Sequence, residues 1–287
     1  MNKICLLVNN IKEINSNADT FIIGLKNYNN LNILELDIEQ IIKLKNSKEI
    51  IISVNKVIHN NELDDLICKL KKLEGYKIIY DDLAIVQIVK DYNLNIELIW
   101  GNIRATTSYN SINAMKDYGV GYSILSPDIT IDEMIEIKNN TCTKLFAPIY
   151  GKFEIFSSNR FLITNYLKYI NKEKKDKKYQ IKNKDLYYDI YEDNSGTHII
   201  NSKYTNGIID YKKILENNID YILINSYDIP FEIDSLINSF ITLRTLYYEN
   251  LLDLNTLVTF HNKFTNINAD SGFLHKKSIY KVGDINE

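Results

Sequence analysis

The feature that most constrains the fold is a series of eight short apolar runs, mostly separated by segments with helical spacing. Alternation of strands and helices predicts parallel βαβ units, and eight strands are the number that closes a barrel. We therefore expect a TIM-type (β/α)8 barrel, possibly distorted. An open doubly wound sheet is the alternative, but no glycine-rich phosphate fingerprint follows the first run. The predicted strands are residues 3–8, 20–24, 50–54, 77–80, 96–100, 122–126, 144–149 and 221–225.

Residues 152–217 separate the last two predicted strands by far more than a usual βα connection. We expect them to form an α+β substructure, with strands near residues 186–191 and 197–200, inserted in a barrel that spans residues 1–250. An amphipathic helix is predicted at 235–250. Residues 251–287 are expected to form a C-terminal helix and a tail that packs on the barrel.

Composition limits the classes of protein that this chain belongs to. With 287 residues and 45% hydrophobic content it can bury a full core, and a net charge of -3 gives no general basic field for nucleic acid. No apolar run approaches the ~20 residues of a membrane span, and the first run is too short for a signal peptide. Cys5, Cys68 and Cys142 are scattered, which predicts no disulfide framework, no iron–sulfur cysteine set and a reducing cytoplasm. No cofactor and no metal pair is evident from the cysteines or the four histidines.

In a barrel, the residues that follow each strand gather on one face and form the site. This predicts a polar rim able to bind a small anion or a base, although polar loop residues also occur on inert surfaces. Arg104 and the 152–217 insertion are expected on the same side. The predicted rim contains Gly24, Asn55, Asp81, Asp82, Gly101, Asn102, Asp128, Tyr150, Gly151, Ser226 and Asp228.

Arginine is scarce in this lysine-rich chain, in which Arg104, Arg160 and Arg244 are the three arginines. A planar fork of five donors suits bidentate binding of carboxylate or phosphate, but an ordinary structural ion pair is an equal alternative for Arg160. Ser158 lies near Arg160 but has no base close to it in sequence, so a serine nucleophile is only weakly indicated. His198 is either a ligand-binding group or a structural histidine.

A lysine-rich run lies inside the insertion. It is either a solvated loop or a local phosphate-binding stripe, with Tyr179, Tyr187 and Tyr188 available for stacking on bases. The candidate RNA contacts are Lys172, Lys174, Lys175, Lys177 and Lys178.

Three stretches carry a family resemblance: residues 54–60, residues 151–166 and residues 192–198. The second contains Ser158, Arg160, Asn165 and Tyr166, and the third reads Glu-Asp-Asn-Ser-Gly-Thr-His. With the 270–273 tail, they make the chain resemble peptidase family U-32, the bacterial collagenase-like proteases, from about residue 50 to the end. Its short branch related to prephenate-dependent 5-hydroxylation of wobble uridine in tRNA is the most similar.

The resemblance implies a barrel, tRNA as a partner, prephenate as a co-substrate and a cluster-bearing paralogue. It also implies that Arg160 binds a carboxylate or phosphate, while Asn55, Asp128 and His198 shape the pocket. Relatives often have His near the end of strand five, Arg-Glu after strand six and His-Gly after strand seven. The present chain has Ile99, Pro127-Asp128 and Tyr150-Gly151 at these places, and its first helix is short.

Each missing polar group is one that could transfer protons, so the catalytic residues stay unassigned. The leading hypothesis is a U-32 protein that acts in tRNA wobble-uridine hydroxylation beside a cluster-bearing paralogue. A collagenase-like peptidase and a non-catalytic binding subunit are the alternatives. The candidate substrate-binding residues are Asn55, Asp82, Arg104, Asp128, Tyr150, Ser158, Arg160 and His198.

Overall fold

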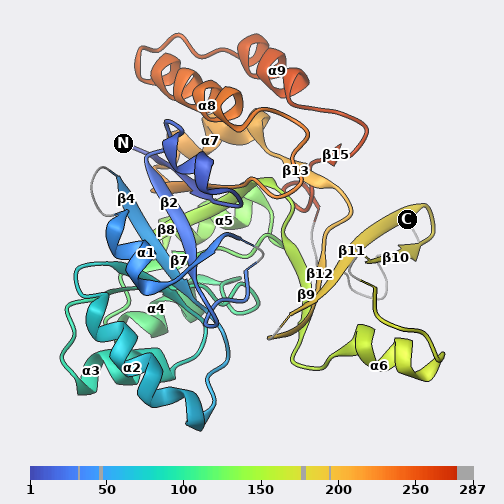
Figure 1. The fold of residues 1–287 in the computed structure, drawn as a ribbon. Helices are drawn as coiled ribbons and strands as arrows, with labels where there is room; N and C mark the ends of the chain where they lie inside the picture. Colours follow the sequence, from blue (N-terminus) through green and yellow to red (C-terminus); the bar gives the residue numbers. More distant parts are fainter. Residues whose placement is uncertain (32, 45–47, 176–178, 194, 277–287) are drawn as a thin grey trace.

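The eight apolar runs form a closed parallel β-barrel, as predicted. The computed structural model describes residues 1–31, 33–44, 48–175, 179–193 and 195–276. Each barrel strand pairs with its neighbour in sequence, and the last strand closes the ring by pairing with both the first and the seventh (Figure 1). The barrel strands are β1 (Lys3–Leu7), β2 (Thr20–Leu25), β4 (Glu49–Val54), β5 (Lys77–Tyr80), β6 (Glu97–Trp100), β7 (Tyr122–Ile124), β8 (Lys144–Gly151) and β14 (Tyr221–Asn225).

The interior of the barrel is filled by alternate residues of its strands, because successive side chains of a strand point to opposite faces. At the N-terminal end, the rings of Phe146 and Tyr221 stack at 4.0 Å between centroids, with Tyr122 beside them. At the C-terminal end the inward residues are aliphatic: Leu7, Ile79, Ile124 and Leu223. The aromatic layer therefore closes the N-terminal end of the barrel. The aliphatic layer lies under any ligand that binds at the C-terminal end.

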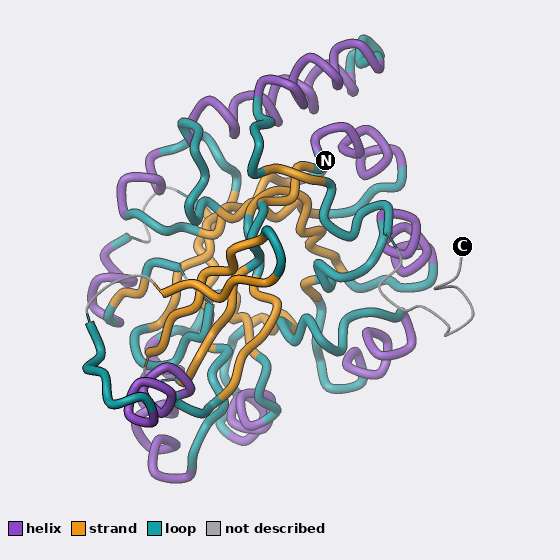
Figure 2. The backbone as a smooth tube through the Cα atoms, turned by 90° about the vertical axis from the view of Figure 1, so that its right-hand side faces the viewer, coloured by secondary structure: helices purple, strands orange, loops and turns teal. Residues whose placement is uncertain are grey.

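Helices surround the outside of the strands (Figure 2). Thr130 and Glu133 form a capping box at the start of one of them, a pattern that is legible in the sequence. The connection between β1 and β2 is short and contains the 3-10 turn η1 (Ile11–Asn15) in place of a full helix, in agreement with the short first helix expected from the sequence. The helices around the barrel are α1 (Ile38–Lys43), α2 (Leu63–Lys72), α3 (Ala84–Asp91), α4 (Tyr109–Lys116), α5 (Ile131–Asn139), α7 (Tyr211–Glu216) and α8 (Ile233–Tyr248); short elements β3 (Glu35–Leu36), η2 (Asn60–Glu62) and η3 (Ile208–Asp210) lie between them.

The long insertion after β8 folds into a separate antiparallel sheet with one helix. Its strand order is β10-β11-β12-β9, and the sheet stands beside the C-terminal end of the barrel (Figure 1). The strands predicted near 186–191 and 197–200 are present as β11 and β12. The elements are β9 (Glu154–Ser158), α6 (Leu162–Tyr169), β10 (Tyr179–Asn183), β11 (Leu186–Asp193) and β12 (Gly196–Ile200).

The chain returns to the barrel through β13 (Tyr204–Asn206), which pairs with β8. After α8, the helix α9 (Leu254–Lys263) leads to β15 (Ala269–Asp270), which pairs with β13. Leu274 is buried, and its carbonyl accepts a hydrogen bond from the Ile131 N–H at 3.0 Å. In the described part of the chain, no helix has the length and apolar character required to cross a membrane.

Candidate functional site

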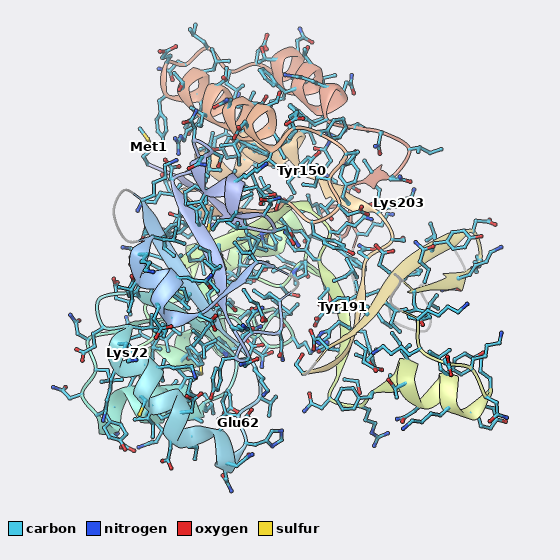
Figure 3. The ribbon with its side chains drawn as sticks, in the orientation of Figure 1. Met1, Glu62, Lys72, Tyr150, Tyr191 and Lys203 are labelled. Atoms are coloured by element: carbon cyan, nitrogen blue, oxygen red, sulfur yellow. The ribbon has the colours of Figure 1, made fainter. Side chains whose placement is uncertain are left out.

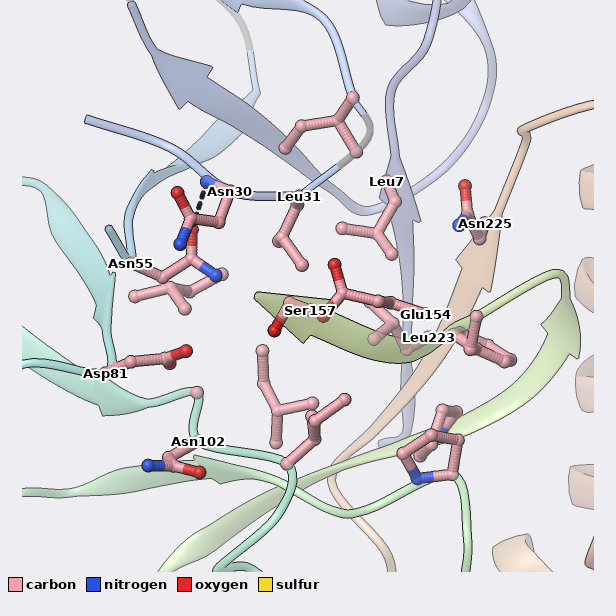
Figure 4. A pocket seen from close by; sticks show the side chains of 18 of the residues that line it. Leu7, Asn30, Leu31, Asn55, Asp81, Asn102, Glu154, Ser157, Leu223 and Asn225 are labelled. Atoms are coloured by element: carbon pink, nitrogen blue, oxygen red, sulfur yellow. Dashed lines mark hydrogen bonds between the residues drawn. The ribbon is translucent and has the colours of Figure 1, made fainter. Parts of the chain in front are cut away.

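A cavity of about 100 Å³ lies where the barrel strands end, between the barrel and β9 of the inserted sheet (Figure 4). The aliphatic layer of the barrel interior forms its floor, and Leu31 and Phe153 contribute to its walls. Polar groups reach it from several connections, as expected for the C-terminal face of a barrel. The polar residues of the lining are Asn30, Asn55, Asp81, Asn102, Arg104, Glu154, Ser157 and Asn225.

Asp81 is the first residue after β5, and its carboxyl points into the cavity (Figure 4). Among the described residues, its buried Oδ1 has no hydrogen-bond partner. Burial raises the pKa of this carboxyl to about 7, with the charge of Glu154 adding to the effect and Asn55 and Arg104 opposing it. Gly101 leaves room for it, because a Cβ there would lie 3.0 Å from Oδ1. Asp81 can therefore both accept and donate a proton near neutral pH.

Asn55 stands beside Asp81 on the same side of the cavity (Figure 4). Its Oδ1 accepts a hydrogen bond from the Asn30 N–H at 2.8 Å and another from the Ser53 hydroxyl at 3.0 Å. These two donors fix which end of the amide is oxygen. The amide nitrogen is then the donor on the Asp81 side, where it lowers the pKa of that carboxyl.

Glu154 of β9 connects the cavity to the inserted sheet. Its Oε1 lies 3.8 Å from Nη2 of Arg104, which also donates to the Ser157 hydroxyl at 3.1 Å. The Arg104 side chain is 56% exposed, so it marks the mouth of the cavity rather than its floor. Asp128 lies near this arginine, whose charge opposes the rise in the Asp128 pKa that burial causes.

His198 is buried and holds the other oxygen of Glu154, with 2.7 Å between Nδ1 and Oε2. Its Nε2 lies 2.8 Å from the Ser195 hydroxyl and 3.5 Å from Oδ1 of Asp193, and its ring stacks on Tyr191 at 4.9 Å. Burial alone would lower the pKa of the imidazole, but the hydrogen bonds to Asp193 and Glu154 raise it to about 9. At neutral pH, His198 is therefore an imidazolium that orients Glu154.

Ser195, His198 and Glu154 form a chain of hydrogen bonds that has the order of a hydrolase triad. The protons, however, are placed differently. Both ring nitrogens of a protonated His198 donate, and the Ser195 hydroxyl donates to Asp193 Oδ1 at 2.6 Å. The serine oxygen thus accepts from the histidine, whereas activation of a nucleophile needs a neutral histidine that accepts from the serine.

The chain matches a known family over most of its length. The model of peptidase family U32 matches residues 9–278. The chain belongs to this family. One relative is the tRNA hydroxylation protein P2 of Bacillus subtilis (strain 168), which is 26% identical over 223 residues, 72% of each chain.

Two solved structures of the spore cortex-lytic enzyme SleL share a weaker likeness with this U32 protein. The Bacillus cereus enzyme gives a TM-score of 0.41 at 11% identity, over 83% of this chain and 74% of that one. The Bacillus megaterium QM B1551 enzyme gives a TM-score of 0.40 at 9% identity, over 83% of this chain and 73% of that one. Scores this low say nothing about the function of the U32 chain.

Of the residues predicted for the site, Asn55 and Arg104 line the cavity, Asp128 lies beside Arg104, and His198 reaches it through Glu154. Asp82 faces away: its carboxylate accepts the N–H groups of Ile58 and Ala84 at 2.8 and 2.9 Å and braces the loop before α3.

Tyr150 is fully buried on the helix side of the barrel, where its hydroxyl donates to the Phe264 carbonyl at 2.9 Å (Figure 3). Ser158 and Arg160 lie at the far end of β9. The Ser158 hydroxyl accepts from the Arg160 N–H at 3.3 Å, and the Arg160 side chain is exposed. These three residues are outside the cavity lining.

The described lysines of the charged run, Lys172, Lys174 and Lys175, are exposed on the inserted substructure, whereas Lys177 and Lys178 lie outside the described residues. Lys174 pairs with Glu192 at 3.0 Å. Within the described ranges, no group of three or more His, Cys, Asp or Glu side chains is placed to hold a metal ion.

Two important residues of the site were not among the sequence-based candidates. Asp81 was predicted to lie on the polar rim, but its neighbour Asp82 was named as the candidate substrate-binding residue. Glu154 was missed, although it is the single acidic residue between Thr143 and Glu173 in a stretch rich in apolar and basic residues. That isolation was the signal that could have found it.

Proposed function

We propose that this U32 protein acts in tRNA modification, as a component of the 5-hydroxylation of wobble uridine. The observation that carries the proposal is the likeness to tRNA hydroxylation protein P2, which extends over 72% of both chains. The polar cavity on the C-terminal face supports it, because this is the end of a barrel at which enzymes bind substrates.

The inserted substructure offers a surface suited to an RNA loop on α6 and the residues that follow it. Tyr166 and Tyr169 on α6 are 62% and 84% exposed, and the exposed Lys172 and Lys175 follow that helix directly. Aromatic faces stack on unpaired bases and lysines contact phosphates. In the proposal this surface holds the RNA while the base enters the cavity.

The proposal includes prephenate as a co-substrate. Among the described residues that line the cavity, Arg104 is the one cation, so a carboxylate co-substrate would bind at the mouth rather than beside Asp81 and Glu154. Deeper in the cavity Glu154 is already paired with His198, so the described lining offers a dianion no second cation there.

The proposal also includes a cluster-bearing paralogue. Hydroxylation adds an oxygen atom and is a redox reaction. Cys5 lies inside the barrel, Cys68 on α2 and Cys142 before β8, so the cysteines of this chain do not fit a cluster. The partner would supply the cluster, and this chain would bind and orient the substrate.

Mass spectrometry of tRNA nucleosides from a strain that lacks the gene tests the proposal. We expect 5-hydroxyuridine and the nucleosides derived from it to fall at least tenfold and to return when the wild-type gene is restored. Unchanged levels of these nucleosides would refute it.

A peptidase is the second candidate, favoured by the chain from Ser195 through His198 to Glu154. It predicts hydrolysis of denatured collagen that is abolished in Ser195→Ala. The charge state of His198 argues against it at neutral pH, so any activity should rise above pH 9, where the imidazole becomes neutral. Activity that survives Ser195→Ala would exclude this serine as the nucleophile.

A further inference from the structure

We infer that the cavity at the C-terminal face binds one pyrimidine base by its amide-like edge, with Asp81 as acceptor and Asn55 as donor, and thereby selects uracil over cytosine. This inference rests on the proposed function, since it assigns the part of the site that would read the wobble uridine. It concerns recognition of the base and makes no claim about the hydroxylation step.

The size and walls of the cavity fit a single ring. Its volume is about 100 Å³, on the scale of an engineered apolar cavity of about 150 Å³ that binds benzene. Leu7, Leu31, Ile79, Ile124 and Leu223 give it an aliphatic floor and wall. A flat ring is buried well by such walls, whereas a highly hydrated ligand is not.

The edge of this cavity presents an acceptor next to a donor. The buried Oδ1 of Asp81 has no hydrogen-bond partner among the described residues, and a buried acceptor of this kind is costly unless a ligand donates to it. The Asn55 nitrogen is the neighbouring donor, because Asn30 and Ser53 fix the amide oxygen on the other side. One of its two N–H groups is directed at Asp81, and the second is the donor assigned to the ligand. Uracil offers N3–H beside a carbonyl and matches this pair. Cytosine offers a bare N3 beside an amine. Its N3 opposes the ionised form of Asp81, which predominates above pH 7, and its amine opposes the Asn55 donor.

The charges around the cavity favour a position of the ribose and phosphates outside it, at the rim. The ionised form of Asp81 repels a phosphate, and the exposed Arg104 attracts one to the mouth. A base turned out of a single-stranded loop would enter with its ribose and phosphates held at the rim. Enzymes that act on a base in RNA or DNA commonly take it out of the stack in this way.

Binding of three synthetic anticodon stem–loop RNAs tests the inference. The RNAs are identical except at the wobble position, which is uridine, cytidine or N3-methyluridine. We expect the wild-type protein to bind the uridine RNA about tenfold more tightly than the other two, because one well-paired base edge supports discrimination of this size. Equal affinities, or no binding of any of the three, would overturn the inference.

Two variants and a control sharpen this test. Asp81→Asn replaces an acceptor by a group that also donates, and should remove the preference for uridine over cytidine. Asn55→Asp keeps the acceptor for the Asn30 N–H but loses the donor, and should weaken binding of the uridine RNA. Asp117→Asn, an exposed carboxyl at the end of α4, should keep the wild-type ratio.

The ratio between RNAs is internal to each preparation, so partial unfolding of a variant does not imitate the effect. An unchanged uridine-to-cytidine ratio in Asp81→Asn would overturn the assignment of Asp81. If uridine is selected in this assay while tRNA nucleosides are unchanged in the deletion strain, the proposed function fails and the cavity assignment stands. If the nucleosides are lost but the three RNAs bind equally, the proposed function stands and this inference fails.

Discussion

Asp81 and Asp82 are neighbours in sequence with opposite environments. Asp81 points into the cavity with an unsatisfied oxygen, and Asp82 turns outward and accepts two backbone N–H groups. Successive side chains at the end of a strand point to opposite sides, so a shift of one residue in the predicted strand end exchanges their roles. Residue types alone could not decide between two aspartates.

The raised pKa of Asp81 predicts a pH-dependent cost to stability. Its folded value of about 7 lies above the ordinary value of 3.8, so the folded protein holds a proton that the unfolded chain releases. The free energy of unfolding therefore falls as pH rises from about 4 to 7. Glu154 and Asp82 raise the pKa of this carboxyl and Arg104 lowers it.

Asp81→Asn should remove this cost. We expect urea titrations to show the variant gaining about 1–2 kcal/mol over wild type between pH 4 and pH 8, a figure reduced for partial exposure of the carboxyl. Asp117→Asn is the control and should track wild type at both pH values. A variant and wild type with parallel pH profiles would show that Asp81 titrates normally.

His198 predicts a second pH dependence in a different window. Its folded pKa of about 9 lies above the ordinary value of 6.5, so its ion pairs stabilise the protein fully below pH 6.5 and are lost as pH rises through 9. His198→Gln should therefore cost about 1–3 kcal/mol at pH 6 and less at pH 9.5. Thermal unfolding at the two pH values measures this, and an equal loss at both would mean that only packing against Tyr191 was removed.

Among the elements, β9 joins the insertion to the site, because it brings Glu154 and Ser157 over the end of the barrel. Periodicity predicted the barrel strands and two strands of the insertion, since each is a local apolar pattern. The pairing of β9 with β12 is a contact between residues about forty positions apart, such as Ser157 with His198. No local pattern encodes that pairing, and the link from Glu154 to His198 could not be predicted without it.

The helix α6 and the lysines after it give a prediction at the scale of an element. Replacing Lys172 and Lys175 together by alanine should weaken binding of the uridine stem–loop RNA. It should also lower the slope of log affinity against log salt concentration by about one to two, because each lysine that contacts a phosphate releases about one counterion. Lys90→Ala on α3 is the control and should change neither quantity. An unchanged slope in the double variant would place the RNA elsewhere.

At the scale of the whole molecule, the described part of the tail, up to residue 276, packs on the barrel. Leu274 is 2% exposed and lies against Gly207, where a Cβ would come within 2.7 Å of its Cδ1. The tail was expected to pack on the barrel, but without helical or strand periodicity its contacts could not be assigned to particular residues from sequence. The closed barrel was readable, because eight apolar runs with helices between them have few alternative arrangements.

The substitution Leu274→Ala tests whether the tail contributes to the stability of the barrel. Removal of a fully buried leucine should lower the free energy of unfolding by about 2–4 kcal/mol, with the main transition shifted as one step. Ile267→Ala is the matched control, because that side chain is 89% exposed and its loss should be almost neutral. A separate early transition in Leu274→Ala would show that the tail unfolds independently of the barrel.

We propose that Asp81 in the barrel cavity serves the hydroxylation of wobble uridine in tRNA. The most direct measurement is mass spectrometry of tRNA nucleosides from the deletion strain complemented by wild type, Asp117→Asn or Asp81→Asn. We expect the first two genes to restore 5-hydroxyuridine-derived nucleosides and Asp81→Asn, at equal protein level, to leave them at least tenfold lower. Full restoration by Asp81→Asn, or nucleosides that never fall in the deletion strain, would contradict the account.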